Sequence, residues 1–244
     1  MPATWFETNR ARRLQGYRLM FGLKRIVCAL ALAALVGTAF HGEAQQDRRQ
    51  RRMNANRQAR IAKMIEDTYS HKYEVFGGIG YLRFRSGEFL QRNNEISWQV
   101  AGNYYLNPRW AVVGDVRGHY GNAKTGNNPY NIWDPLITHY TFMGGPQYRF
   151  YRKERLSANV NVLGGMAMGN FDGGSKGVPA PALGLWKTGN AGAFALGGSV
   201  DYSFYPNLAF RFAPTYQITT FGSTLQHNVG FNAGLVYRWG HQSK

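Results

Sequence analysis

The sequence predicts an all-β fold, an eight-stranded antiparallel up-and-down transmembrane β-barrel over residues 73–240 that follows a basic N-terminal tail. Three observations predict this fold. From residue 73 onward, apolar and polar side chains alternate in eight segments, which is the period of a β-strand. The composition, with 15 Phe, 15 Tyr, 6 Trp and 30 Gly, is typical of β-rich proteins. Short and long connections also follow one another along the chain, as they do in membrane barrels.

The first predicted element is a secretory signal peptide over residues 1–44. An apolar run at 26–36 follows two basic residues and precedes a small-residue cleavage site that ends at Ala44. The true start could be Met20, since a conventional leader begins there. A membrane anchor is the alternative, but the run is shorter than the roughly 20 residues that a spanning helix needs. The single cysteine, Cys28, lies in this run, so no internal disulfide is expected.

The second predicted element, residues 45–72, is a basic periplasmic tail that is partly helical or disordered. Seven Lys and Arg residues lie between Arg48 and Lys63, and large apolar side chains are few. The tail could bind anionic lipid, cell-wall polymer or nucleic acid, or it could simply be solvated. We favour the solvated tail and expect no nucleic-acid partner, because secretion removes nucleic acid from reach. The net charge of +16 does not by itself indicate nucleic-acid binding, because 14 of the 29 basic residues precede residue 73 and so lie outside the predicted barrel.

Eight strands are predicted next, each long enough to cross a membrane, for which a tilted strand needs about 9 to 11 residues. The segment 95–106 shows the alternation, with Trp98 and Val100 on one face and Gln99 and Asn103 on the other. In 74–85 both faces hold apolar residues, so its inward face stays open. The predicted spans are 74–85, 95–106, 109–120, 136–150, 154–168, 190–204, 207–221 and 226–239.

The faces and the connections indicate a membrane barrel with its apolar side outward. A soluble lipocalin-like barrel is the alternative, but it would have to crowd the large aromatic side chains of all strands into a small interior. Aromatic residues also gather at segment ends, as at a membrane interface: Tyr104, Trp110, Tyr148, Phe150, Tyr202, Phe204, Tyr237 and Trp239. The connections 106–110, 151–155 and 205–208 are short, and 86–94, 121–135 and 170–189 are long. We therefore expect short periplasmic turns and longer external loops. Residues 241–244 form a short C-terminal tail.

The pattern over roughly 74–239 resembles the small bacterial outer-membrane β-barrel proteins of the OmpA/OmpX-like superfamily. The most specific part is the last segment, where Asn232, Gly234, Tyr237 and Trp239 match the C-terminal signal that the family's barrel assembly machinery recognises. The chain departs from the family in the five residues after Trp239 and in the basic tail. The resemblance implies a monomer in the cell outer membrane of a Gram-negative bacterium, with outer-membrane lipid and the assembly machinery as partners.

The polar faces of the segments would meet inside the barrel. An eight-stranded barrel has an interior just wide enough for side chains. Four arginines facing two aspartates would need further acceptors, for which Glu74 and Glu95 are candidates whose face is uncertain. We interpret these side chains as a plug, with a narrow anion-preferring pore as the alternative. The predicted lumen network is Asp115, Arg117, Arg149, Asp201, Arg211 and Arg238.

Catalysis and metal binding are weaker hypotheses. A rim-located lipid-modifying enzyme could use His119, His139 and His227 beside Asp134 or Ser223, and three histidines could also hold a metal. Neither idea has a nucleophile motif or a metal-ligand spacing behind it, so we expect no enzyme, no cofactor and no metal.

We therefore predict a barrel of structural or surface-interaction type. Exposed aromatic residues in the long loops would contact an external ligand that the sequence does not identify. The candidates for such contacts are Tyr130, Trp133, Phe171 and Trp186.

Overall fold

A computed structural model describes residues 55–241 of the chain, with side chains from residue 57 onward. The predicted signal peptide, residues 45–54 of the predicted tail and residues 242–244 lie outside this described part. The rest of the tail contains helix α2 (Ala55–Tyr69). In the described part of the chain, no helix is both long and apolar enough to span a membrane.

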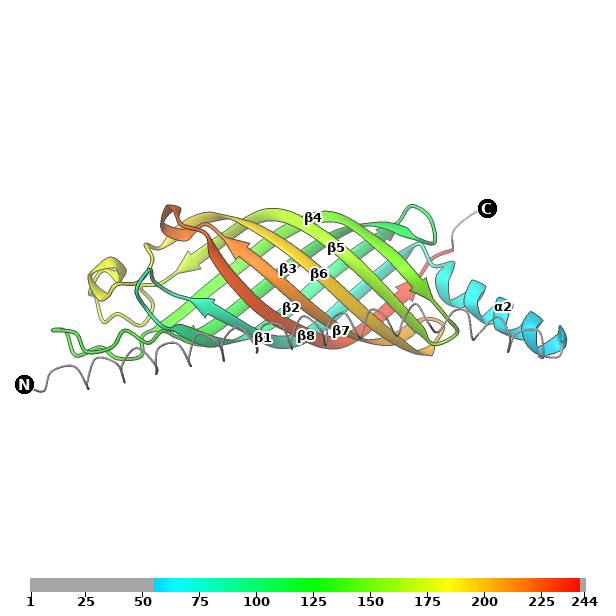
Figure 1. The fold of residues 1–244 in the computed structure, drawn as a ribbon, viewed down its shortest axis with the longest axis horizontal. Coiled ribbons are helices and arrows are strands. Elements are labelled where there is room, and N and C mark those ends of the chain that lie inside the picture. The colour runs from blue at the N-terminus through cyan, green and yellow to red at the C-terminus, as the bar shows by residue number, and fades with distance from the viewer. Residues whose placement is uncertain (1–54, 242–244) are drawn as a thin grey trace, which may run out of the picture. The chain divides into compact units, whose positions relative to one another are not determined.

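The eight strands form one closed antiparallel barrel in which each strand pairs with its neighbours along the chain. Strand β1 pairs with β2 on one side and with β8 on the other, with Tyr73 opposite Trp239, so no strand edge is left open. Figure 1 shows the tilted strands of this closed sheet. The predicted fold class is confirmed. The strands are β1 (Tyr73–Arg85), β2 (Arg92–Tyr105), β3 (Trp110–Asn122), β4 (Leu136–Arg152), β5 (Leu156–Asn170), β6 (Gly189–Tyr205), β7 (Leu208–Thr219) and β8 (Gln226–Trp239).

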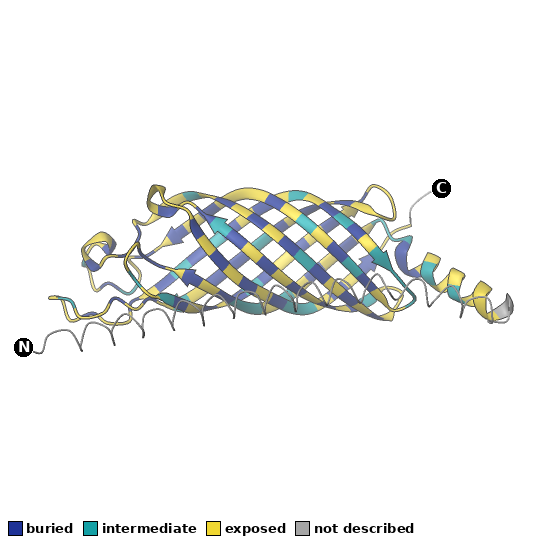
Figure 2. Cartoon of the chain, viewed as in Figure 1, coloured by how far each residue is buried: buried dark blue, intermediate teal, exposed yellow. Residues whose placement is uncertain are grey.

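The barrel is apolar outside and polar inside. Burial alternates residue by residue along the strands, and Figure 2 shows this as a chequered pattern. Ile79 and Ile96 on the outer face are each 74% exposed, whereas the charged Arg117 and Arg238 are among the largest fully buried side chains. A soluble lipocalin-like barrel would carry the reverse pattern, so that alternative is wrong.

The two ends of the barrel differ. The connections 106–109, 153–155 and 206–207 are short and define what we call the turn end. The connections 86–91, 123–135, 171–188 and 220–225 define the loop end, and all four are longer than the connections of the turn end. Outward aromatic rings contact one another around the turn end: Tyr73 lies 5.5 Å from Tyr104 and 5.8 Å from Trp239, centroid to centroid.

The β5–β6 loop packs apolar side chains against the loop end of the barrel. This loop contains the 3-10 helix η1 (Ala180–Leu183), and the β7–β8 loop contains η2 (Phe221–Ser223). Trp186 donates a hydrogen bond from Nε1 to the carbonyl oxygen of Arg85 at 2.8 Å, which ties the β5–β6 loop to the end of β1. We call Phe84, Phe171, Trp186 and Phe221, all buried, the aromatic cap.

Candidate functional site: the polar lumen

A cluster of ionised side chains fills the lumen near the turn end. Its centre is Glu74, whose carboxylate accepts hydrogen bonds from Arg211 at 2.6 Å and Arg238 at 2.9 Å. Arg149 is the third arginine in contact with Glu74, at 3.4 Å. Asp201 is the second acid, with Arg211 Nε at 2.6 Å and Arg238 at 3.0 Å. The turn-end cluster is Glu74, Arg149, Asp201, Arg211 and Arg238, and each member is at most 4% exposed.

Strand register brings these residues together. Glu74 lies directly opposite Arg238 in the β1–β8 pair, and Asp201 lies opposite Arg211 in the β6–β7 pair. Directly opposed residues of antiparallel strands have neighbouring side chains, so each opposed pair places an acid beside a base. Two shared carboxylates then bridge between these pairs across the lumen. The arrangement links strands that are far apart around the barrel.

Two tyrosines complete the turn end. Tyr105 receives a very short hydrogen bond from Arg149, and its hydroxyl is also the acceptor for the side-chain amide of Gln147 at 3.1 Å. Tyr69, in the last turn of α2, is 3% exposed and donates to the carbonyl oxygen of Lys153 at 2.7 Å. Burial raises the pKa of Tyr69 above its usual value, so its hydroxyl stays protonated at neutral pH. The guanidinium of Arg149 lies 5.0 Å from the Tyr69 ring, a cation–π contact.

A second ion pair fills the middle of the lumen. Arg117 donates from Nε to Asp115 at 2.6 Å, and Gln99 donates to the other oxygen of the same carboxylate in a very short hydrogen bond. Beside this pair lies a cavity of about 10 Å³, lined in part by Gln147 and Asn161, which is room for roughly one water molecule.

Charge inside the barrel is balanced. The buried bases of the described residues are Arg117, Arg149, Arg211 and Arg238. The buried acids are Glu74, Glu95, Asp115 and Asp201, so the formal charges sum to zero with neutral histidines. Each arginine lies within 3.4 Å of at least one carboxylate. Pairing of this kind is what makes buried charges tolerable.

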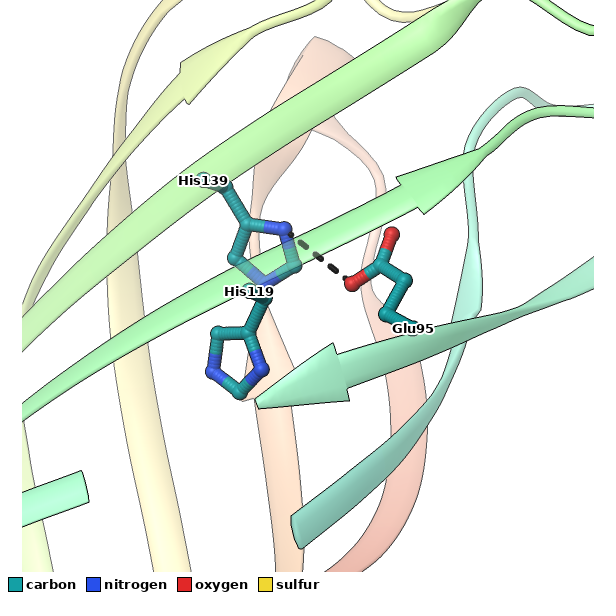
Figure 3. Close-up of side chains that lie close together, drawn as sticks. All are labelled: Glu95, His119 and His139. Atoms are coloured by element: carbon teal, nitrogen blue, oxygen red, sulfur yellow. Dashed lines mark ion pairs between the residues drawn. The ribbon is translucent and has the colours of Figure 1, made fainter. Parts of the chain in front are cut away.

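A third polar group lies nearer the loop end, below the aromatic cap. Glu95, His119 and His139 come from three adjacent strands, β2, β3 and β4, and point toward one another (Figure 3). Their side chains are at most 1% exposed. The ring of Phe84, a member of the aromatic cap, lies 4.6 Å from the His139 ring, centroid to centroid.

All six residues of the predicted lumen network lie in the interior. Four of them belong to the turn-end cluster and two form the central pair. The acceptors that the sequence left uncertain, Glu74 and Glu95, are both inside as well. Glu74 was uncertain because its strand carries Phe76, Leu82 and Phe84 on the inward face too, so hydrophobicity did not separate the two faces.

Two hypotheses about the loop end, a weak alternative and an expected set of exposed loop residues, differ from the structure. His119 and His139 lie inside the lumen, while His227 is outside and hydrogen-bonds Tyr216 at 2.7 Å, so the three histidines form no common rim site. Phe171 and Trp186 are 0% and 7% exposed, because the β5–β6 loop turns them inward. Of the four expected aromatic contact residues, only Tyr130 and Trp133 are exposed, at 49% and 55%.

The residues of the predicted assembly signal lie at the seam where β8 meets β1. Tyr237 and Trp239 face outward and stack at 5.9 Å between centroids, and Asn232 faces inward and accepts a hydrogen bond from Ser97 at 2.8 Å. Gly234 lies opposite Gly78, and a Cβ at position 234 would collide with the backbone of β1. Glycine is therefore required here by the close approach of the two strands.

The inside-out pattern, the closed sheet and the aromatic rings at one end define a closed eight-stranded barrel with the architecture of a membrane-spanning β-barrel. No protein-family model matches the sequence, and no curated protein matches it. Solved structures with a similar fold include Neisserial surface protein A, NspA, at 14% sequence identity over 69% of this chain and 97% of that chain, with a TM-score of 0.47.

Two further solved structures are similar in the same way. OprG from Pseudomonas aeruginosa is 13% identical over 70% of this chain and 97% of that chain, with a TM-score of 0.48. Ail, the attachment invasion locus protein of Yersinia pestis, is 16% identical over 70% of this chain and 99% of that chain, with a TM-score of 0.43.

Proposed function

We propose that the protein is a structural or surface-interaction barrel of the outer membrane whose lumen is closed to solutes and which catalyses no reaction. In this proposal the turn end faces the periplasm and the loop end faces the outside. The observation that carries the proposal is the filling of the lumen at three levels, by the turn-end cluster, by the Asp115–Arg117 pair and by the aromatic cap.

Electrostatics argue against the narrow anion-preferring pore. A path for anions needs arginines whose charge is free to attract them. Here the four buried arginines are each held by carboxylates at distances of 2.6 to 3.4 Å, and the buried formal charges cancel. An entering anion would have to displace an existing acidic partner, because every buried arginine is already held by at least one carboxylate.

The surface role rests on the loop end. Phe89, 92% exposed, joins Tyr130 and Trp133 as a large apolar side chain exposed in the loops. Exposed aromatic side chains are frequent anchors in protein interfaces.

The rim-enzyme alternative loses its basis, since its candidate histidines do not converge on one site. Outer-membrane lipid and the barrel assembly machinery are the proposed partners, and the proposed state is a monomer.

Planar-bilayer recording tests the closed lumen. The mature protein, purified in folded form and added to a bilayer in potassium chloride, is expected to give no resolvable conductance steps, while a general porin added at the same concentration gives them. Regular, anion-selective steps from the wild-type protein would overturn the proposal and support the pore. Folding is checked in the same sample by comparing gel migration with and without boiling.

A further inference from the structure

The group beneath the aromatic cap gathers five buried polar atoms without hydrogen-bond partners, although side chains elsewhere in the lumen, such as Gln99, Asn161 and Gln217, also have unpaired atoms. Both ring nitrogens of His119 and of His139, and Oε2 of Glu95, are buried and accept or donate no hydrogen bond. His139 Nδ1 approaches Glu95 Oε2 to 3.4 Å, which is an ion-pair distance without hydrogen-bond alignment (Figure 3). Buried polar atoms without partners cost free energy, so five of them in one group need a reason.

Comparison with the other buried carboxylates shows that Glu95 has no cationic partner. Every other buried carboxylate in the described lumen contacts an arginine, but Glu95 contacts none. Its only hydrogen bond comes from the side-chain amide of Asn93, at 3.0 Å to Oε1, which orients the carboxylate and leaves Oε2 directed toward the histidines. A positive charge is the natural partner for that free oxygen.

The backbone holds the three side chains in place. His119 and His139 lie directly opposite each other in the β3–β4 pair, and their rings stack with centroids 4.4 Å apart. Glu95 lies opposite Gly121, and a Cβ at position 121 would approach the Glu95 Cγ to 2.6 Å. Glycine at this position therefore leaves the space through which the glutamate side chain reaches the histidines.

We propose that Glu95, His119 and His139 bind a divalent transition-metal ion inside the barrel. One potential ligand atom from each residue lies within 4.8 Å of the others. Metal–ligand bonds of about 2.0 to 2.2 Å place tetrahedral ligand atoms roughly 3.4 Å apart, so modest side-chain rotations close the site. Two imidazoles and one carboxylate suit zinc, copper, nickel or iron better than magnesium or calcium, which prefer oxygen ligands throughout.

The surroundings favour retention of such an ion. A metal ion would supply the positive charge that Glu95 lacks and would engage the lone pair of one nitrogen in each imidazole. Asn93 would hold the carboxylate from outside the ligand shell. The rings of Phe84 and Phe221 lie 4.6 and 6.3 Å from the His139 ring, centroid to centroid, and keep bulk water from the ligands. Exchange with the outside would then require the cap to open, so metal uptake is expected mainly during folding.

The test is metal retention by the mature barrel, free of any histidine tag, refolded in detergent with Zn²⁺ present or added afterwards. After gel filtration, about one zinc per folded barrel is expected in the sample that was refolded with Zn²⁺. Glu95→Gln, His119→Gln and His139→Gln should each weaken retention by at least 10-fold, since even outer-shell changes cost roughly 10- to 100-fold. His227→Gln changes an exposed histidine of β8 and His71→Gln changes a half-buried histidine in the segment before β1. Both are the matched controls and should retain zinc normally.

Two further readouts decide the outcome if a histidine variant fails to fold. Glu95→Gln preserves side-chain shape, so its folding can be checked by heat-modifiable migration while it loses a charged ligand. Copper(II) in the wild-type protein should show electron paramagnetic resonance splitting from two nitrogen nuclei. A wild-type barrel that retains no zinc and gives no nitrogen splitting overturns the proposal. So does equal zinc retention by a folded Glu95→Gln or His119→Gln variant.

Discussion

Glu74 is the residue on which most of the lumen's buried charge depends. Its two oxygens contact Arg149, Arg211 and Arg238, and they also accept a hydrogen bond from Asn103 at 2.6 Å. The other acid in contact with these arginines is Asp201, and it contacts two of the three. Removing the charge at position 74 therefore leaves Arg149 without any carboxylate and the cluster with three cations against one anion.

Glu74→Gln is expected to destabilise the barrel strongly. Removing one partner of a buried ion pair typically costs about 3–5 kcal/mol, because the remaining charges stay buried without compensation. The measurement is the free energy of unfolding in urea of the protein refolded in lipid vesicles. Glu88→Gln, in the exposed β1–β2 loop, makes the same chemical change and should stay within about 0.5 kcal/mol of the wild type. Equal stabilities for the two variants would contradict the central place of Glu74.

At this scale the sequence could predict the inward face of most strands but not all contacts. Strict alternation puts Asp115, Arg117 and Arg211 inside, and the structure agrees. Alternation cannot choose a face where both are apolar, as in β1, and so it left the face of Glu74 open. It also places His119 and His139 on the polar face without showing that a distant loop covers them, because loop packing depends on contacts such as Trp186 with Arg85.

At the scale of elements, the β1–β8 seam is where the first and last strands close the barrel. Two residues of the predicted signal, Tyr237 and Trp239, face outward, and a third, Asn232, faces the lumen. Trp239 also stacks on Tyr73 of β1, with ring centroids 5.8 Å apart. The aromatic pair thus has a structural contact in addition to its predicted recognition by the assembly machinery.

Changing both Tyr237 and Trp239 to Ala is expected to reduce the amount of folded barrel in the outer membrane by several fold, because the recognition element of the last strand is lost. Heat-modifiable protein in isolated outer membranes is the quantity to measure. The matched control is Tyr202→Ala with Phe204→Ala, which removes an exposed aromatic pair with centroids 5.4 Å apart at the same end of β6.

The control separates recognition from packing. If both double variants reduce assembly equally, rim packing explains the loss and the C-terminal signal has no special role. In detergent, without assembly machinery, both double variants are expected to refold to similar extents.

Loops were the elements that the sequence described least well. The short connections follow from tight polar turns, and all three lie where the sequence predicts them. The long β5–β6 loop reads as a flexible, Gly-rich and Pro-rich segment, yet it contains η1 and buries Phe171 and Trp186. Its burial depends on long-range contacts with β1 and with Phe221, which no local pattern encodes.

For the whole molecule, the decisive property is a continuous apolar outer surface that water cannot solvate well. Large apolar side chains are exposed on every strand, among them Ile79, Ile96, Val112, Phe142 and Leu196. Exposed apolar area of this extent is typical of a surface that meets lipid. The polar lumen also favours a membrane barrel, because a soluble barrel would bury apolar side chains, and not charged ones, in its core.

A lipid-facing surface predicts that the cost of a charge depends on its depth. Leu196 lies in the middle of β6, and Leu156 begins β5 at the turn end; they are 52% and 39% exposed. Leu196→Arg should destabilise the barrel in phospholipid vesicles by about 2–4 kcal/mol, whereas Leu156→Arg, near the interface, should cost about 0–1 kcal/mol. Both are measured as free energies of unfolding in denaturant. Because the two substitutions are chemically identical, the difference reports position alone, and equal small costs would mean that the middle of this surface does not lie in the membrane.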